Sequence, residues 1–496
     1  MKKRIISMIL AALMVTAILV SCREGGGGGG KETGTTDTAA VTEPAEQSEI
    51  DEYVNELATR YDTAGKTFTY IGHQVNFPTE EKDTGEILSD SLYYRQRDLT
   101  EIFGIDWDPV PLDGGPTTKD QVINEVTAGG NDYDLACGGM LTCGQALLNA
   151  GVIRQVQDLE HVDFDREWWV QSMRDTFSVK GKLYFLFGPI VPYTYLDTHV
   201  VLFNKSLTGM FSINDSDLYD AALSGKWTVD ELERVASAVP AVTNATNGVY
   251  RYVHPVGVPF LFAAGQTITK FDEEGAPYVD ETLSIELSDI SDRLVSFQGD
   301  ETQTALLKKD EDASKKYGVE TLETLFLNNR ALFYFADTGD VMYLRQQAVE
   351  FGILPMPKLN EAQSDYRSYS NPWVGQAVYI PKTVKDIEFV DLMTEAMGAL
   401  SQKYVKDAYY DRMLRTQAIF DLESQETLEI VFQSKIYDMS VLYSDGNDSS
   451  WGPFLDAIEK ALSYDNSTFT SDYKSNARVA KINIKFLIKT VEDDNG

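Results

Sequence analysis

Residue types that most often carry catalysis or bind metals are scarce in this 496-residue chain. Its four histidines and three cysteines form no HExxH or comparable metal-ligand spacing. The sequence also lacks a GxSxG nucleophile elbow and a GxxxxGKS or GxxxxGKT phosphate loop. These absences favour a binding protein over an enzyme, with neither a metal nor a cofactor. A carboxylate pair acting on a glycoside remains an alternative, because sequence does not show how far apart two acidic side chains lie in space.

Positive charge is scarce as well. The chain has 43 Lys and Arg residues against 77 Asp and Glu residues, which gives a formal net charge of -34. A chain of this balance lacks the basic surface that follows a phosphate backbone, so nucleic acid is not an expected partner. Hydrophobic residues make up 43% of the sequence, which is enough for two or three domain-sized cores.

The amino terminus has the pattern of a targeting segment. Residues 2–4 are basic, and residues 5–20 form an apolar run that is short for a membrane span. The run ends in Leu-Val-Ser-Cys at 19–22, which resembles the lipobox of bacterial lipoproteins. The resemblance implies a signal peptide over 1–21 and a lipidated Cys22, whose diacylglyceryl group suffices to anchor the chain at the outer face of the cell membrane. The alternative is an ordinary secretory signal with a cysteine near its end.

Residues 22–48 are predicted to be the lipidated cysteine and a flexible tether. They are rich in Gly, Thr, Ala and Glu, with six consecutive glycines at 25–30, and have too little apolar surface to fold. A flexible chain of this length reaches about 28 Å. Beyond the tether only Cys137 and Cys143 remain, and their spacing suits neither zinc nor a disulfide-rich scaffold. They could form one disulfide or stay as two thiols.

Helical and strand patterns alternate along the body of the chain. Apolar runs predict strands at 67–72, 105–110, 133–137, 198–204, 331–336 and 376–380, and apolar residues at helical spacing predict helices at 49–61, 89–103, 119–128, 384–403 and 477–491. Ser89 or Asp90 is expected to cap the second of these helices, and Thr228 to cap another. The charged region 303–325 is expected to be a solvated helix. Such alternation is typical of an α/β fold with mostly parallel sheets.

The order of several short segments resembles one family. They are TAGGNDYDL (127–135), LLNAGVIRQVQDL (147–159), GKLYFLF (181–187), VVLFNKSL (200–207), GKWTVDEL (225–232), FLNNRALFYFAD (326–337) and GILPMPKL (352–359). In this order they resemble the extracellular solute-binding proteins of bacterial carbohydrate ABC importers, the maltose-binding-like superfamily. The resemblance implies two hinge-linked lobes, each a mostly parallel sheet flanked by helices. Lobe one is expected at 49–200 plus 338–400, entered again through 351–359, and lobe two at 201–337 plus 401–496.

A sugar site needs aromatic planes for its C–H faces and planar polar groups for its hydroxyls. Side chains of both kinds lie at predicted loop positions. The loop after the strand at 67–72 is a candidate contact because ligands bind outside the carboxyl ends of strands in open α/β sheets. The candidates for ligand contact are Trp373, Tyr369 and Asn371, Tyr193 and Tyr195, Asp337, and His73 and Gln74. For each of them the alternative is a packing role. Trp168 and Trp169 are expected to anchor a helix to its sheet.

Together these patterns predict a lipid-anchored, monomeric binding subunit. It would capture a sugar or oligosaccharide by closure of two lobes and deliver it to the membrane permease of an ABC importer. One alternative is a binding protein for a peptide or an amine. A site dominated by unpaired carboxylates would favour such a solute when it is a cation. The other is a surface glycoside hydrolase.

Overall fold

The computed structural model describes residues 45–113, 115–253, 257–280, 282–308, 311–344, 346–409, 422–445 and 451–494. The predicted signal peptide, Cys22 and most of the predicted tether lie outside these residues. The first described helix, α2 (Ala45–Leu57), begins four residues before the expected start of the folded body. Residues 46–496 form one compact unit, and all of the described core residues lie within it.

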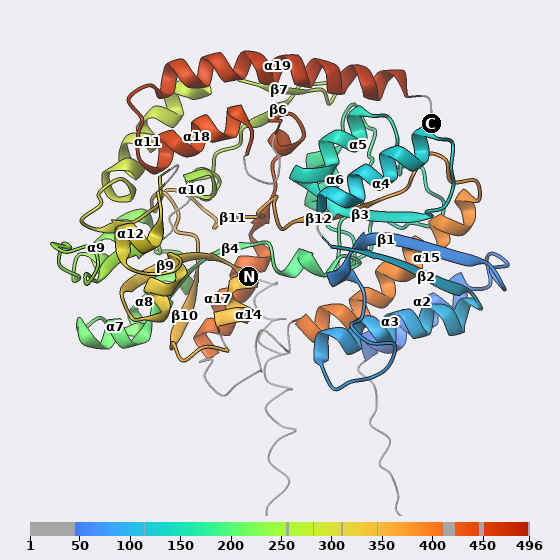
Figure 1. Ribbon diagram of the computed structural model, residues 1–496, viewed down its shortest axis with the longest axis horizontal. Coiled ribbons are helices and arrows are strands. Elements are labelled where there is room, and N and C mark those ends of the chain that lie inside the picture. Colours follow the sequence, from blue (N-terminus) through green and yellow to red (C-terminus); the bar gives the residue numbers. More distant parts are fainter. Residues whose placement is uncertain are drawn as a thin grey trace, which may run out of the picture. The chain divides into compact units, whose positions relative to one another are not determined.

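The first sheet has the strand order β12-β3-β1-β2. Its strands are β1 (Thr67–His73), β2 (Asp106–Leu112), β3 (Leu135–Gly139) and β12 (Gln376–Tyr379). β1 pairs in parallel with β2 and β3, and β12 pairs antiparallel with β3. Figure 1 shows α2, α3 (Ile87–Phe103) and α15 (Ile387–Ser401) on one face of this sheet, with α4 (Gly115–Thr127) and α5 (Gln145–Asn149) on the other. The predicted alternation of strands and helices is confirmed here.

The second sheet has the strand order β10-β4-β9-β5-β8. Its strands are β4 (His199–Asn204), β5 (Tyr250–Val253), β8 (Thr304–Ala305), β9 (Ala331–Asp337) and β10 (Phe351–Pro355). β4 is antiparallel to β10 and β9, whereas β9, β5 and β8 run parallel. The expected return to lobe one at 351–359 is wrong, because every residue of β10 pairs with β4. The chain rejoins the first sheet only at β12.

Two small ribbons complete the strands. They are β6 (Thr269–Phe271) with β7 (Pro277–Val279), and β11 (Ser368–Tyr369) with β13 (Lys435–Ile436). The other α-helices are α6 (Gln171–Phe177), α7 (Lys205–Met210), α8 (Asp215–Leu223), α9 (Val229–Ala236), α10 (Gly257–Ala263), α11 (Leu283–Gln298), α12 (Ala313–Tyr317), α13 (Glu323–Leu327), α14 (Thr338–Leu344), α17 (Leu422–Gln433), α18 (Pro453–Ser463) and α19 (Phe469–Asp493). Short 3₁₀ or π turns are η2 (Gln74–Asn76), η3 (Met140–Gly144), η4 (Pro192–Tyr195), η5 (Gln402–Lys406) and η6 (Met439–Leu442). Among the described residues of the expected helix at 303–325, β8 and α12 lie within the range and α13 begins in it, so these residues do not form one continuous helix.

The helix ends follow local side-chain chemistry. Thr228 caps α9 as predicted, since its side chain accepts a hydrogen bond from the amide of Glu231. The cap of α3 is Glu86 rather than Ser89 or Asp90, because the Glu86 carboxylate accepts from the amide of Ser89 at 2.8 Å. α3 stops at Gly104, which adopts a φ of 63° that costs a glycine little.

The last helix, α19, is longer than predicted and contacts helices of both sheets. It packs on α18 and α11 and also on α5 of the first sheet (Figure 1). Just beyond its end, the Asp494 carboxylate pairs with Lys382 and accepts hydrogen bonds from Gln155 and Tyr184 at 3.0 and 2.9 Å. Residues at its carboxyl end are thereby attached to the lobe that holds the first sheet.

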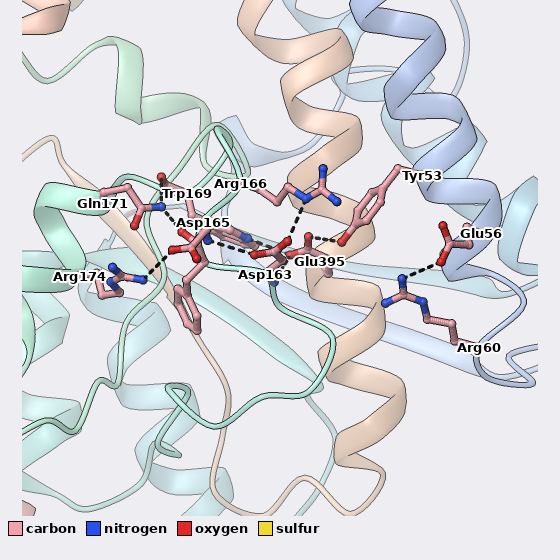
Figure 2. A network of polar contacts seen from close by, with 11 residues as sticks. Tyr53, Glu56, Arg60, Asp163, Asp165, Arg166, Trp169, Gln171, Arg174 and Glu395 are labelled. Carbon is pink, nitrogen blue, oxygen red and sulfur yellow. Dashed lines mark hydrogen bonds and ion pairs between the residues drawn. The ribbon is translucent and has the colours of Figure 1, made fainter.

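Trp168 and Trp169 were expected to anchor a helix to its sheet, and in the structure they pack a loop against the helix α15. Gly398 of α15 permits the contact, because a Cβ atom there would lie 2.9 Å from ring atoms of both tryptophans. The indole of Trp169 and the hydroxyl of Tyr53 each donate to the buried carboxylate of Glu395 at 2.8 Å (Figure 2). Glu395 therefore joins α2, α15 and the 163–169 loop.

The two cysteines of the body are free thiols. Cys137 and Cys143 are both completely buried and form no disulfide. Burial raises the pKa of the Cys137 thiol to about 12.

Candidate functional site

A cavity of about 390 Å³ lies beside the carboxyl end of β9. This volume is within the range of small-molecule sites. Its lining includes three predicted residues, Asp337, Asn371 and Trp373, together with His199, Leu306, Leu307, Phe335, Ala336, Asp340, Trp451, Glu459, Ser463 and Tyr464. The second sheet, the 371–375 turn and α18 therefore share this cavity.

The pairing of β4 with β9 places His199 directly opposite Asp337. The His199 Nδ1 lies 2.8 Å from one oxygen of the Asp337 carboxylate, and the other oxygen accepts a hydrogen bond of 2.7 Å from the Asn371 amide. His199 is 7% exposed, and its Nε2 has no hydrogen-bond partner among the described residues. A buried donor or acceptor at a cavity wall is suited to a polar ligand group.

Asn371 shapes the turn that carries Trp373. Its side-chain oxygen accepts from the backbone amide of Trp373 at 3.1 Å, and its carbonyl accepts from the amides of Val374 and Gly375. Such an Asx arrangement fixes the backbone two residues further on. Asn371 is therefore a positioning residue that joins Asp337 to Trp373.

Two tryptophans form the aromatic part of the wall. The Trp373 ring lies 3.9 Å from that of Trp451, at an interplanar angle of 75°. Trp451 is 8% exposed, whereas Trp373 is half-buried. Tyr369 lies behind this wall rather than in it, with 1% exposure and its ring stacked 4.2 Å from Phe262. Burial raises the Tyr369 pKa well above its usual range.

The polar part of the wall is acidic. Asp337, Asp340 and Glu459 contribute carboxylates, and no Lys or Arg is among the described residues that line the cavity. The Glu459 carboxylate accepts from the backbone amides of Gly257 and Val258 at 2.9 and 2.7 Å. Burial nevertheless raises the pKa of Glu459. Such a wall can accept hydrogen bonds from hydroxyl or ammonium groups and disfavours anions.

The other predicted residues lie outside this cavity. His73 and Tyr193 contact each other, with ring centroids 5.6 Å apart, and Gln74 is exposed on the next turn. Tyr195 stacks on Tyr409 at 5.5 Å in a separate apolar cluster. Burial is the main cause that raises the Tyr193 pKa and lowers the His73 pKa. Of the predicted set, Asp337, Asn371 and Trp373 line the cavity, the aromatic and histidine side chains elsewhere pack against neighbours, and Gln74 is exposed.

A buried ion pair lies close to the cavity, where chain segments pass between the two sheets. Lys435 Nζ pairs with the Asp197 carboxylate, and both side chains are at least nine-tenths buried. The other Asp197 oxygen accepts from the Ser370 hydroxyl at 2.5 Å, and the Asp197 carbonyl accepts from the amide of Asn371. Three segments distant in sequence are therefore joined at one carboxylate.

A second hollow, of about 470 Å³, lies on α2 beside Tyr53 and Trp168. Four of the residues that line it are Glu49, Asp165, Arg166 and Glu167. The Arg166 guanidinium already covers the Tyr53 ring at 4.3 Å. Its aromatic faces are thus occupied, which makes the Trp373 cavity the better candidate.

Sequence patterns missed His199, Trp451 and Glu459. His199 could have been found from the pairing of two predicted strands, because it starts the strand that lies opposite Asp337. Trp451 precedes Gly452 and Pro453 at the start of α18, a helix-start signal, but nothing local places it near Trp373. The described residues contain no group of three or more His, Cys, Asp or Glu side chains arranged to hold a metal ion.

No protein-family model and no curated protein sequence matches the chain. Solved structures do match it. An extracellular solute-binding protein from Staphylococcus aureus in complex with maltose has a TM-score of 0.55 and 12% identity, over 85% of this chain and 98% of that one. The chain has the fold of a two-lobed solute-binding protein. The predicted fold class is therefore confirmed.

Two further structures show the same similarity. The galacto-N-biose/lacto-N-biose I-binding protein of the ABC transporter from Bifidobacterium longum has a TM-score of 0.52 and 13% identity, over 85% of this chain and 97% of that one. The GacH receptor of Streptomyces glaucescens, solved unliganded and with acarbose, has a TM-score of 0.51 and 14% identity, over 85% of this chain and 98% of that one. At these identities the similarity concerns the fold.

Proposed function

We propose that this chain is the solute-binding subunit of an ABC importer and that it captures a sugar or oligosaccharide in the Trp373 cavity. The observation that carries the proposal is the joint placement of Trp373, Asp337 and Asn371 around one cavity of about 390 Å³. An indole can stack on the C–H face of a pyranose ring, and carboxylate and amide groups can bind its hydroxyls. The solved structures of the same fold are described as complexes with maltose, lacto-N-biose and acarbose, which supports this solute class.

Lobe closure would trap the solute. The hinge in this proposal is the set of crossing segments joined at Asp197, near residues 194–199, 368–376 and 434–438. Lobe one would then end near residue 198 and resume near residue 371, later than the predicted 338, because β10 belongs to the second sheet. A few backbone torsions in such crossings suffice to open and close a cleft.

Delivery to the importer completes the proposed role. A monomer anchored through a lipidated Cys22 on the outer face of the membrane would pass the solute to the permease subunits. Among the described residues, no helix combines the length and apolar character that a membrane crossing requires. The membrane anchor in this proposal is the predicted lipid on Cys22, and no catalytic role is proposed for any residue.

An amine is the second candidate solute. The three carboxylates of the cavity wall favour it, because an ammonium group is attracted to carboxylates. Two observations favour a sugar. The Asp337 carboxylate already pairs with His199 and accepts a hydrogen bond from Asn371, and the Glu459 carboxylate already accepts hydrogen bonds from two backbone amides.

Titration calorimetry and thermal shift with residues 46–496 test the proposal. The panel contains neutral mono- and oligosaccharides, peptides and polyamines. A solute at about 100 times its Kd should stabilise the protein by about 2.7 kcal/mol. Binding of saccharides alone supports the proposal, and binding of polyamines alone replaces it with the second candidate. Release of shorter sugars from a bound oligosaccharide would instead establish a glycoside hydrolase.

A further inference from the structure

α19 has a charge opposite to that of the rest of the chain. Residues 473–491 contain five basic residues and no acidic one, although the whole chain carries a formal net charge of -34. The basic residues are Lys474, Arg478, Lys481, Lys485 and Lys489. The helix has 25 residues, which corresponds to a length of about 37 Å.

The helix also presents apolar side chains to solvent. Its buried side is made of the residues Phe469, Tyr473, Ala477, Ala480, Ile484, Leu487 and Val491. On the opposite side Val479, Ile482 and Phe486 are 44%, 65% and 52% exposed. Their spacing of three and four residues places them in one stripe. Figure 1 shows α19 (red) at the periphery of the body, with α11, α18 and α5 all on its inner side.

Most of the basic side chains beside this stripe are exposed. Lys474, Arg478, Lys485 and Lys489 are exposed and take part in no ion pair among the described residues. Arg478 and Lys485 precede the apolar residues Val479 and Phe486 directly, so the basic stripe runs alongside the apolar one. A helix with exposed apolar residues and an exposed basic flank is typical of helices that lie at an anionic interface.

We propose that the outer face of α19 docks on the surface of a membrane that contains anionic phospholipid. Val479, Ile482 and Phe486 enter the boundary between headgroups and acyl chains, and the basic stripe binds the phosphates. A lipid surface fits better than an acidic protein, because the face combines a stripe of exposed apolar side chains with an adjacent stripe of long basic ones along one helix. The predicted tether of about 28 Å would hold the body within reach of such a surface.

Vesicle co-sedimentation of residues 46–496, which include no lipidation site, tests the proposal. Binding is expected to vesicles of phosphatidylglycerol mixed with phosphatidylcholine, to weaken with added salt, and to be absent from phosphatidylcholine alone. Arg478→Glu/Lys485→Glu/Lys489→Glu should weaken binding on the order of 100-fold, because each basic residue at such a surface contributes about fivefold. Ile482→Ser/Phe486→Ser should weaken it by roughly tenfold or more.

The matched control is Lys82→Glu/Lys226→Glu/Lys315→Glu. These three lysines are exposed and lie outside α19. Their replacement changes the net charge by the same amount as the triple substitution in α19. The control should bind vesicles nearly as well as the wild type, and melting curves should show that every variant folds. Equal loss in the control and the α19 variant would overturn the proposal, because net charge rather than this face would then govern binding. Absence of binding to phosphatidylglycerol would overturn it as well, and would leave an acidic protein as the occupant to test.

Discussion

Replacing Glu395 with glutamine should remove one defined component of the pH dependence of stability. Glu395 is completely buried and accepts hydrogen bonds from Tyr53, Trp169 and the amide of Asp163 (Figure 2). Burial raises its pKa from 4.5 to about 7, although these hydrogen bonds lower it. Glutamine keeps the contacts, since its oxygen can accept from Trp169 and Asp163 while its amide donates to the Tyr53 oxygen.

The sign follows from the raised pKa. Between pH 4.5 and about 7 the folded state binds the proton of Glu395 more tightly than the unfolded state does, so stability falls as pH rises through this interval. One pKa unit corresponds to about 1.36 kcal/mol. Ionisation of Glu395 should therefore make the free energy of unfolding above pH 7 about 3 kcal/mol lower than it is below pH 4.5. Glu395→Gln should therefore be more stable than the wild type at about pH 8 and similar to it at about pH 4.5.

Urea denaturation across this pH range measures the effect. The quantity of interest is the free energy of unfolding of Glu395→Gln minus that of the wild type, because Asp391, one turn earlier, also has a pKa raised by burial and contributes to both proteins. Glu56→Gln is the control, since Glu56 is an exposed carboxylate on α2 that pairs with Arg60. A difference that stays constant with pH would refute the reasoning, and so would an equal pH effect in Glu56→Gln.

Three further predictions concern the site, the crossing segments and the thiols. Trp373→Ala should weaken solute binding by roughly tenfold or more in calorimetry, with a nearly unchanged melting curve because Trp373 is half-buried; unchanged affinity with lower stability would make Trp373 a packing residue. Lys435→Met should lower the free energy of unfolding by about 3–5 kcal/mol, since it leaves a buried carboxylate unpaired, and adding Asp197→Asn should recover much of it in denaturant titrations; no recovery would contradict this. Cys137 and Cys143 should react with a thiol reagent only after unfolding, and fast reaction of the native protein would contradict their burial.

Much of the fold could be predicted because its strands are short apolar runs of distinctive pattern. The strand predicted at 331–336 is β9 (Ala331–Asp337), and the one at 67–72 is β1 (Thr67–His73). The sheet of β10 could not be predicted in the same way. A buried run of five residues fits the middle or the edge of either sheet, and the choice depends on pairing with β4, about 150 residues earlier in the chain.

Part of the candidate site could be proposed from the sequence. Asp337 ends β9, where the rule for open α/β sheets expects ligands. Asn371 and Trp373 stand in the loop before β12, and only their amide and aromatic side chains selected them. Tyr369 stands in the same loop, but Phe262 from α10 stacks on its ring and buries it. Tyr195 faces Tyr409 instead of the cavity, since loop sequence does not determine which side of a 3₁₀ turn points to solvent.

The proposed site and the proposed hinge share a residue. Asn371 donates to the Asp337 carboxylate at the cavity wall through its side chain and to the Asp197 carbonyl through its backbone amide, while its side-chain oxygen holds the amide of Trp373. Asp197 is in turn fixed by Lys435 and by the hydroxyl of Ser370. A solute that stacks on Trp373 would therefore contact the 371–375 turn, which is hydrogen-bonded to Asp197 in the crossing segments. Recognition and lobe closure would then be coupled through Asn371, since its side chain holds the cavity wall and its backbone amide holds the crossing segment.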